Sequence, residues 1–256
     1  RTLGTVEEVY FEGGEPFLFY PVVVEGIRLA RQMGFRAGIV SNGYWSTCIE
    51  DAKLWLAPLA EMGISDLSVS DDELHYGDRS DSPAKCALAA ATALGMPTSS
   101  ICKAKPEVLE SPDTGKGKGA PEISGGTKLR GRAAEKFAGA LPTRSRGELK
   151  ECPYEKLAYP QRVHIDAYGN VQVCQGISIG NCWDTPFSSL IKNHDAEKHA
   201  ICGPLIRGGP VRLAEEHGVD LKGEYADECH LCYATRVALL DEFPQVLAPR
   251  QVYGTE

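Results

Sequence analysis

Short apolar runs alternate with longer segments of helical spacing through the N-terminal part of the chain. The short runs are rich in Val, Ile and aromatic residues and end in polar residues, the pattern of buried strands. The longer segments carry apolar residues three and four positions apart, and glycine follows each of them, as it often does at helix ends. We expect strands at residues 5–12, 35–40, 64–70 and 98–104, and helices at residues 21–33, 47–62 and 82–94. This order predicts an α/β fold of βα units around a parallel sheet.

The second part of the chain has a different pattern. Residues 105–127 lack periodicity and are broken by Gly and Pro, so we expect a loop there. The segment 163–174 alternates apolar and polar residues on either side of Tyr168-Gly169-Asn170, which predicts a β-hairpin ending at Cys174. Helices are expected at residues 130–141, at 187–193 and after Cys232, short helices and loops at 199–222, and no regular structure beyond Pro249. The composition changes near residues 146–151. We therefore expect two domains, which comprise residues 1–147 and 148–256.

Composition and charge exclude several classes of protein. Hydrophobic residues make up 43% of the chain, enough for a sizeable core, and the net charge of −8 gives no general attraction for nucleic acid. No apolar run approaches the ~20 residues that span a bilayer, and no signal peptide is visible. We expect a cytoplasmic protein that binds neither membrane nor nucleic acid. Because the chain opens with Arg1 and enters a strand almost at once, we also expect that an N-terminal segment is missing.

Nine cysteines are an odd number in a chain of 256 residues, which is large enough to fold without disulfides. Metal or redox use is therefore the stronger expectation. Cys152, Cys174 and the C-x-x-C pair Cys229 and Cys232 are candidates to close around one metal centre. Iron–sulfur clusters are usually held by four cysteines, whereas a structural zinc site more often shows two C-x-x-C pairs. One [4Fe–4S] cluster is favoured over zinc. We expect Cys48, Cys86 and Cys102 to pack in a core. Cys182 and Cys202 are expected either in the core or as extra ligands of the metal centre.

Polar residues cluster where three consecutive strands of the expected sheet end. Gly13-Gly14-Glu15-Pro16 follows the first strand, Ser41-Asn42-Gly43 the second, and Ser70-Asp71-Asp72 the third. Successive glycines let the backbone turn sharply and approach a ligand closely, and their amides can bind an anion or a carbonyl group. An ordinary βα turn explains the glycines alone equally well. Because ligands sit at the carboxyl ends of the strands in barrels of βα units, we expect the three clusters to form one site.

Together these motifs resemble those of radical S-adenosylmethionine (SAM) enzymes that carry a C-terminal iron–sulfur domain of the SPASM/twitch type. Gly13-Gly14-Glu15-Pro16 is similar to the family's GGE motif, which contacts the amino group of SAM. Ser41-Asn42-Gly43 resembles the polar end of the next strand. Ser70 with Asp72 and His75 resembles the following loop, where the family contacts the SAM ribose and carboxylate. Cys152, Gly169 and Cys174, with Cys229 and Cys232 as the closing pair, resemble the twitch pattern C-x(9–15)-G-x(4)-C, although the first gap here has 16 residues.

The resemblance implies a partial (β/α) barrel over residues 1–147 and a small α+β domain with a β-hairpin over residues 148–256. It implies an auxiliary [4Fe–4S] cluster on Cys152, Cys174, Cys229 and Cys232. The SAM-binding residues that it implies are Gly13, Gly14, Glu15, Pro16, Ser41, Asn42 and Ser70. The family's C-x-x-x-C-x-x-C loop, which holds the catalytic [4Fe–4S] cluster, is absent from the chain. We therefore expect a fragment that lacks its first βα segment and does not cleave SAM alone.

The implied activity of the parent enzyme is of the oxidoreductase type. In the family, a reduced cluster on the missing loop gives an electron to SAM, and the resulting 5′-deoxyadenosyl radical removes a hydrogen atom from the substrate. The implied partners are a peptide or small-metabolite substrate and a reductant such as ferredoxin or flavodoxin. No catalytic residue is identified, since Asp72 and His75 are candidates by position alone. A non-catalytic zinc-binding or interaction module on an α/β scaffold is the alternative.

Overall fold

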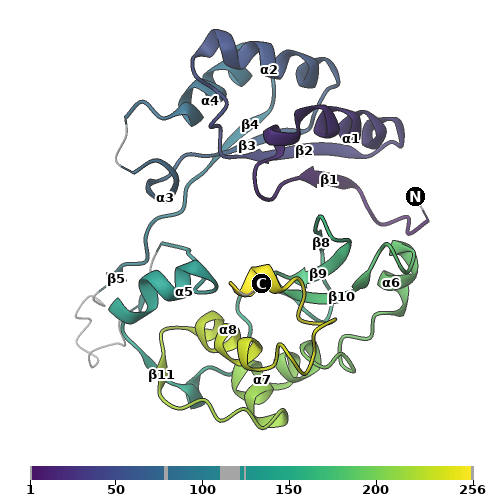
Figure 1. Ribbon diagram of the computed structural model, residues 1–256. Helices are drawn as coiled ribbons and strands as arrows, with labels where there is room; N and C mark the ends of the chain where they lie inside the picture. The colour runs from purple at the N-terminus through teal and green to yellow at the C-terminus, as the bar shows by residue number, and fades with distance from the viewer. Residues whose placement is uncertain (1, 78–79, 110–121, 124, 255–256) are drawn as a thin grey trace, which may run out of the picture. The chain divides into compact units, whose positions relative to one another are not determined.

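The chain folds into two compact units, Arg1–Lys105 and Pro106–Glu256, in a computed structural model that describes residues 2–77, 80–109, 122–123 and 125–254 (Figure 1). Each unit has a hydrophobic core of its own. The expected boundary between residues 147 and 148 lies inside the second unit. This is because Ala134 packs in the second core and Arg144–Ser145 pairs with Glu224–Tyr225.

A four-stranded parallel sheet forms the centre of the first unit, as the sequence pattern predicts. The strands adjoin in the order in which they occur in the chain. They are β1 (Glu8–Phe11), β2 (Arg36–Ser41), β3 (Asp66–Ser70) and β4 (Thr98–Ile101). The intervening helices are η1 (Pro16–Phe19), α1 (Tyr20–Gln32), α2 (Ile49–Glu61), α3 (Glu73–Tyr76) and α4 (Pro83–Ala93). The single turn α3 was not expected, and it forms because the Asp72 side chain caps it by accepting from His75 N at 3.1 Å.

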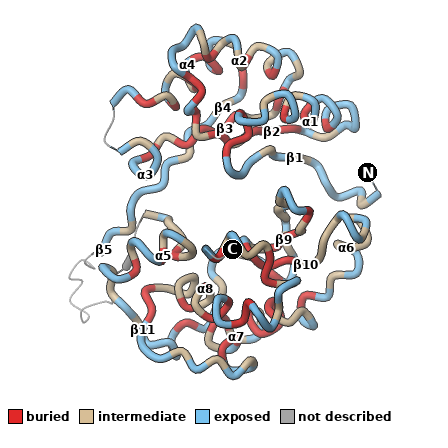
Figure 2. The backbone as a smooth tube through the Cα atoms, viewed as in Figure 1, coloured by how far each residue is buried: buried red, intermediate tan, exposed pale blue. Residues whose placement is uncertain are grey.

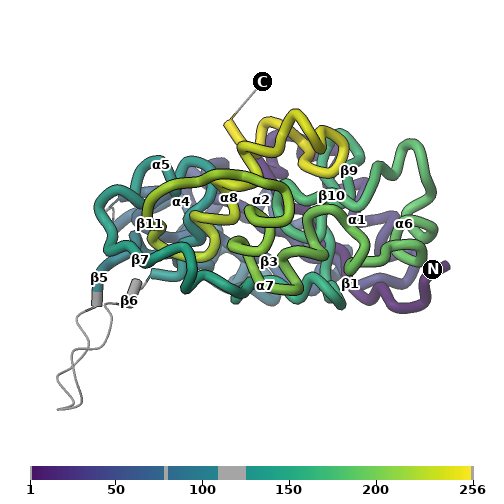
Figure 3. The backbone as a smooth tube through the Cα atoms, turned by 90° about the horizontal axis from the view of Figure 1, so that it is seen from below, coloured from purple at the N-terminus to yellow at the C-terminus, as the bar shows by residue number. Residues whose placement is uncertain are grey.

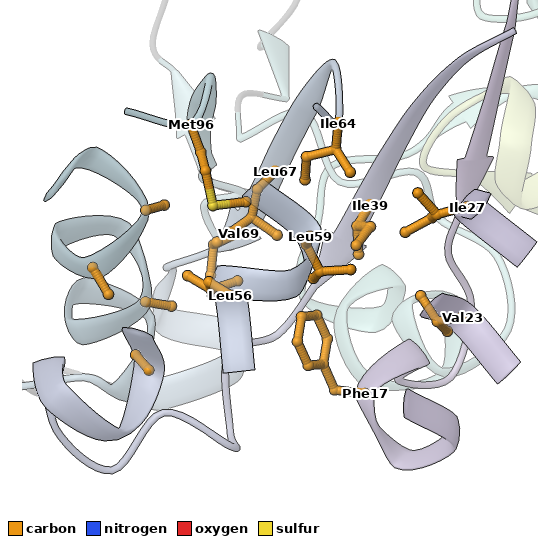
Figure 4. Packing of buried hydrophobic residues seen from close by; sticks show 14 of the residues in the cluster. Phe17, Val23, Ile27, Ile39, Leu56, Leu59, Ile64, Leu67, Val69 and Met96 are labelled. Carbon is orange, nitrogen blue, oxygen red and sulfur yellow. The ribbon is translucent and has the colours of Figure 1, made fainter. Parts of the chain in front are cut away.

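The three long helices of the first unit share one face of the sheet. Right-handed crossovers between strands added in sequence order place such helices on the same side, and Figure 1 shows α1, α2 and α4 together there, whereas the single turn α3 lies apart from them. Figure 4 shows Ile39 and Leu67 of the strands packing among Ile27, Leu56 and Leu59 of the helices, and all five are fully buried. Burial of each such side chain contributes about 1.5–3 kcal/mol.

The opposite face of this sheet is polar. Side chains alternate along a strand, so Tyr10 and Asp66 point away from the helices, whereas their neighbours Phe11 and Leu67 pack in the helix-covered core. The Tyr10 hydroxyl donates to Asp66 Oδ2 at 3.5 Å, and the hydroxyls of Ser68 and Ser99 lie 2.9 Å apart. The sheet therefore has one apolar, covered face and one polar face.

The second unit contains the predicted hairpin within a three-stranded antiparallel sheet. The strands β8 (His164–Ile165) and β9 (Asn170–Cys174) form the hairpin, and β10 (Ile177–Asn181), which the sequence analysis did not expect, adds to β9. The Asp166 carboxylate holds the turn, since it accepts from the amides of Tyr168 and Asn170 and from Gln172 Nε2 at 2.9–3.0 Å. Figure 2 shows buried residues concentrated along β9, β10 and α7.

Helices and short strands surround this sheet. They are β5 (Val108–Leu109), β6 (Glu122–Ile123), α5 (Arg132–Phe137), η2 (Ala138–Ala140), β7 (Arg144–Ser145), η3 (Arg146–Glu148), α6 (Phe187–Asn193), α7 (Cys202–Glu216), β11 (Glu224–Tyr225), α8 (Glu228–Ala238) and η4 (Arg250–Tyr253). Helix α7 is broken at Gly208 and Gly209, where the backbone leaves helical geometry. None of the described helices is both long and apolar enough to span a membrane.

Two expectations for the C-terminal region are wrong. The final helix does not start after Cys232 but at Glu228, because the Asp227 side chain caps it, so the C-x-x-C pair lies inside its first turns. The segment beyond Pro249 is not without structure, since η4 brings Tyr253 into the core, where it is 3% exposed and stacks on Tyr233. Figure 3 shows this C-terminal segment beside β9 and β10, and Ser178 N donates to Val246 O at 2.7 Å.

Candidate functional site

Four cysteines from separate parts of the second unit line one pocket. They are the four that the sequence analysis grouped: Cys152, Cys174, Cys229 and Cys232. None of the nine cysteines forms a disulfide, so all four are free thiols. The fold thus brings the quartet together, and its role as a ligand set stays a prediction.

Local structure explains how each thiol reaches the pocket. Cys174 is the last residue of β9, and Cys152 follows η3 on a loop. The Asp227 carboxylate accepts from His230 N at 2.7 Å, which starts α8 just before the C-x-x-C pair. Cys229 and Cys232 are three residues apart, so they face the same side of that helix. His230, which lies between them, accepts from the Ala226 amide through Nδ1 at 3.3 Å and does not line the pocket.

Two arginines also line the pocket. Arg130 donates from Nη1 to Cys174 Sγ at 3.2 Å. Arg236, which is 2% exposed, lies one helical turn after Cys232 and donates from Nη1 to Gln175 O at 2.8 Å. Sequence analysis does not single out Arg236, although its i+4 spacing from Cys232 is a usable signal, since such residues share a helix face.

Two of the three glutamates that line the pocket are paired with cations, and the third, Glu151, is exposed to solvent. Glu155 accepts from Lys128 Nζ at 2.8 Å, and Glu228 accepts from Arg144 at 3.0 Å. Lys128 also lies over the ring of Tyr154, 4.9 Å from its centroid. Arg130 contacts the Cys174 thiol, whereas Arg236 donates to backbone carbonyls and to the Tyr253 hydroxyl.

Burial controls the protonation of the thiols. It raises the pKa of Cys232 to about 11 and raises the pKa values of Cys152 and Cys229, with the neighbouring cysteines adding to the effect. Thiols with such pKa values are neutral at pH 7, whereas metals bind thiolates. A metal centre in this pocket would therefore release protons as it binds, and its affinity would rise with pH.

The described residues form no preassembled site for a single ion. Among the described residues, no group of three or more His, Cys, Asp or Glu side chains could hold a metal ion. A tetrahedral zinc with Zn–S bonds of about 2.3 Å needs its sulfur atoms within about 4 Å of one another. Each thiolate of a four-iron cluster binds a different iron, so such a cluster needs sulfurs that stand farther apart. The donor set of four cysteines in one pocket fits the cluster.

None of the remaining cysteines lines the pocket, but Cys202 lies close to it, because burial and then the neighbouring Cys174, Cys232 and Cys152 raise its pKa to about 12. Cys202 is fully buried in the second core, and Cys182, whose amide donates to Gly169 O at 2.8 Å, is half-buried beyond β10. The expectation that Cys48, Cys86 and Cys102 pack in a core is wrong for two of them, because Cys48 and Cys102 are exposed. Cys48 is instead the N-cap of α2, where its sulfur accepts from Asp51 N at 3.4 Å.

A second candidate site lies at the carboxyl ends of β1 and β2 in the first unit. The Glu15 side chain is buried and its Oε1 accepts from Phe17 N at 3.1 Å and from the Ser41 hydroxyl at 2.9 Å. Its Oε2 accepts from Asn42 N at 2.7 Å. The fold therefore joins Glu15, Ser41 and Asn42, which the sequence analysis placed in one cluster.

The other residues predicted for this site have local roles in the structure. Gly13 and Gly14 have φ values of +88° and +48°, which side-chain-bearing residues rarely adopt, and no atom would obstruct a Cβ at either position. Pro16 is the buried first residue of η1. Ser70 is 9% exposed at the end of β3. A carboxylate accepts up to about four hydrogen bonds, so Glu15 retains capacity for one further donor.

The loop after β3 contains a carboxylate–histidine pair. Asp72 Oδ1 lies 2.7 Å from His75 Nδ1, and Asp72 Oδ2 accepts from Lys103 N at 3.1 Å. Burial acts to raise the pKa of Asp72, but the hydrogen bonds from His75 and Lys103 outweigh it and hold that pKa below its ordinary value. The pair fixes the loop and orients the imidazole.

Comparison with models of known protein families gives no match to this chain, and no curated protein matches it. What each site binds must therefore be inferred from the residues of this chain.

Proposed function

We propose that the second unit, Pro106–Glu256, holds an auxiliary [4Fe–4S] cluster on Cys152, Cys174, Cys229 and Cys232, and that the chain belongs to a radical SAM enzyme. The observation that carries the proposal is that four free thiols from three separate segments line one pocket. Free cysteines scattered through a core would have no reason to meet. Four thiolates complete the coordination of a four-iron cluster without any other ligand.

One feature favours the cluster over zinc. The pocket presents a cationic side chain to the sulfurs, with Arg130 donating to Cys174 Sγ at 3.2 Å. Hydrogen bonds to sulfur are a means by which proteins tune iron–sulfur clusters.

The first unit supports the SAM part of the proposal. Its strands follow in sequence order with α1, α2 and α4 on one face. A singly wound barrel begins in this way, whereas doubly wound folds cover both faces of the sheet. The face opposite these helices is polar, as the wall of a ligand-binding interior would be. Glu15, Ser41 and Asn42 meet at the carboxyl ends of the strands, where barrel enzymes bind their ligands.

In this proposal the amino group of SAM would donate a hydrogen bond to the Glu15 carboxylate, which can accept one more. The turn at Gly13 and Gly14 would let the ligand approach the backbone closely. Ser41, Asn42, Pro16 and Ser70 shape the same strand ends. When bound beside a reduced catalytic cluster, SAM supplies a carbon radical that removes hydrogen from a substrate. The protein's own residues bind and orient, and they exclude water. The substrate is a peptide or a small metabolite, and the reductant is of the ferredoxin or flavodoxin class.

Anaerobic reconstitution tests the cluster. The purified chain is incubated with ferrous iron and sulfide, desalted, and assayed for iron, sulfide, zinc and visible absorption. We expect about four iron and four sulfide per chain and a broad brown absorption band. Serine at any of the four ligand positions should lower the iron content sharply. The matched control Cys182→Ser, in the same unit but outside the pocket, should retain it.

A colourless protein that holds one zinc per chain would contradict the cluster and support the zinc-binding module. Loss of iron in the Cys182 variant but not in the Cys174 variant would show a different ligand set. The catalytic part of the proposal has its own test, which is the genomic sequence upstream of the Arg1 codon. The proposal requires a C-x-x-x-C-x-x-C motif there, and its absence would remove the radical chemistry while leaving the cluster proposal intact.

A further inference from the structure

Arg236 is a buried cation whose neighbours are neutral as long as the thiols are protonated. Its guanidinium donates to Gln175 O at 2.8 Å, to the Tyr253 hydroxyl at 3.1 Å and to Cys232 O at 3.4 Å. The groups with the strongest electrostatic effect on its charge are Cys232, Tyr253, Cys174 and Cys229, with no carboxylate among them. Arginine cannot shed its proton in a protein, so this charge is permanent.

A buried charge without a partner costs several kcal/mol, which argues that the folded protein supplies an anion. The carboxylates that border the pocket do not serve, because Glu155 pairs with Lys128 and Glu228 pairs with Arg144, whereas Glu151 is exposed to solvent and no hydrogen bond joins it to Arg236. The thiols are therefore the groups in the pocket that can supply negative charge to the arginines.

Arg130 reaches the same sulfurs from another element. It precedes α5 in the chain, whereas Arg236 belongs to α8, and its Nη1 donates to Cys174 Sγ at 3.2 Å. Two permanent positive charges from different elements therefore border one group of thiols. A neutral thiol gains little from either charge, whereas a thiolate bound to iron gains a charge-assisted hydrogen bond from the one that contacts it.

We propose that Arg236 and Arg130 are the built-in counter-charges of the cluster and set its reduction potential, an inference that rests on the function proposed above. A cluster held by four thiolates carries net negative charge, and reduction by one electron adds to it. A fixed cation stabilises the more negative, reduced form. Both arginines therefore raise the potential, and they act as tuning residues and not as ligands.

The test compares reduction potentials among reconstituted variants of the full chain. Arg236→Gln, Arg236→Lys and Arg130→Gln are each titrated anaerobically with dithionite, which delivers one electron to each cluster, and reduction is followed by visible bleaching and electron paramagnetic resonance. We expect both glutamine variants to shift to a more negative potential and the lysine variant to remain close to the unmodified chain. Arg212→Gln is the matched control, because Arg212 is an exposed arginine of the same unit paired with Glu216, and it should leave the potential unchanged.

The outcomes separate this inference from the function on which it rests. If the unmodified chain and the glutamine variants all bind iron and have the same potential, the counter-charge role is overturned and the cluster stands. If the unmodified chain takes up no iron, the proposed function fails, and the counter-charge role falls with it. If Arg236→Gln does not fold, as judged by circular dichroism, Arg130→Gln decides the question, because the more exposed Arg130 is not part of the buried hydrogen-bond set of Tyr253 and Gln175.

Discussion

The Cα of Gly209 packs so closely on the backbone of Glu151 that a Cβ there would overlap with Glu151 N and with the carbonyl carbon of Lys150. Gly209 sits at the break in α7 with φ +67° and ψ −161°, a conformation that is essentially restricted to glycine. Glu151 precedes Cys152, the thiol that reaches the pocket on a loop. The contact therefore ties the position of Cys152 to the break in α7.

Gly209→Ala should lower the free energy of unfolding by about 2 kcal/mol or more, because strain at this φ and overlap with backbone atoms add. It should also lower iron retention, since the displaced backbone carries Cys152. The control is Gly218→Ala, where φ is +64° and no atom lies within 4 Å of a Cβ, so that conformational strain acts alone. Denaturant unfolding and iron assays measure both effects. Equal losses in the two variants would show that the close contact has no importance of its own.

Glu15→Gln should destabilise the first unit by about 1–3 kcal/mol. The carboxylate accepts three hydrogen bonds from Phe17, Ser41 and Asn42. A carboxamide must turn its NH₂ group toward at least one of these donors and leave it unsatisfied in a buried place. Denaturant unfolding measures the change, and Glu25→Gln, at an exposed position of α1 paired with Arg28, is the control expected to change little. Equal stability of the two variants would contradict the buried role of Glu15.

Cys48→Ser should stabilise the first unit by about 0.5–1 kcal/mol. Cys48 caps α2 through its sulfur, which is a weak acceptor, and it accepts from Asp51 N at 3.4 Å. A serine hydroxyl is a stronger acceptor in the same position. Thermal or denaturant unfolding measures the gain. Cys86→Ser inside α4 lacks a capping role and should give no gain, and a similar rise in both variants would count against the cap.

Stability of the second unit should fall as the pH drops below about 6.5, in part through His199. His199 Nδ1 accepts from the amides of Ile201 and Cys202 at 3.2 and 3.1 Å, so Nε2 carries the proton and donates to Ser178 O at 3.1 Å. Burial lowers the pKa of His199, although the hydrogen bond to Ser178 opposes the shift. The unfolded chain therefore takes up a proton at higher pH than the folded chain, and acid favours unfolding.

The stabilisation from neutral His199 is complete above the ordinary histidine pKa and is lost as pH falls through the lower value of the folded state. Burial also lowers the pKa values of His194 and His230, so they contribute with the same sign. Comparison of the unmodified chain with His199→Gln isolates the single residue. Between pH 7.5 and pH 5 the variant should lose less of its unfolding free energy. Parallel curves would show that His199 does not contribute.

The order of strands and helices in the first unit follows from local chemistry, and the sequence alone predicts it. Short apolar runs, helical spacing and the glycines after each helix are properties of neighbouring residues, which the sequence shows directly. The parallel sheet that they predict is confirmed. Local caps are not visible in the apolar pattern. Asp72 begins a helical turn that this pattern does not show, and Asp227 starts the final helix at Glu228, four residues before Cys232. Tyr253 is buried because the core of the second unit receives it.

The sequence by itself determined which residues are candidates for a functional site: the cysteines with their C-x-x-C pair, and the polar ends of consecutive strands. Only the tertiary structure decided that Cys152, Cys174, Cys229 and Cys232 share a pocket, and that Arg236 and Arg130 face them while Glu155 and Glu228 are paired elsewhere. Residue type and short spacing are local properties that a sequence displays directly. Which distant groups meet, and whether a buried charge finds a partner, depends on packing between elements far apart in the chain, and that information is absent from any single stretch of sequence.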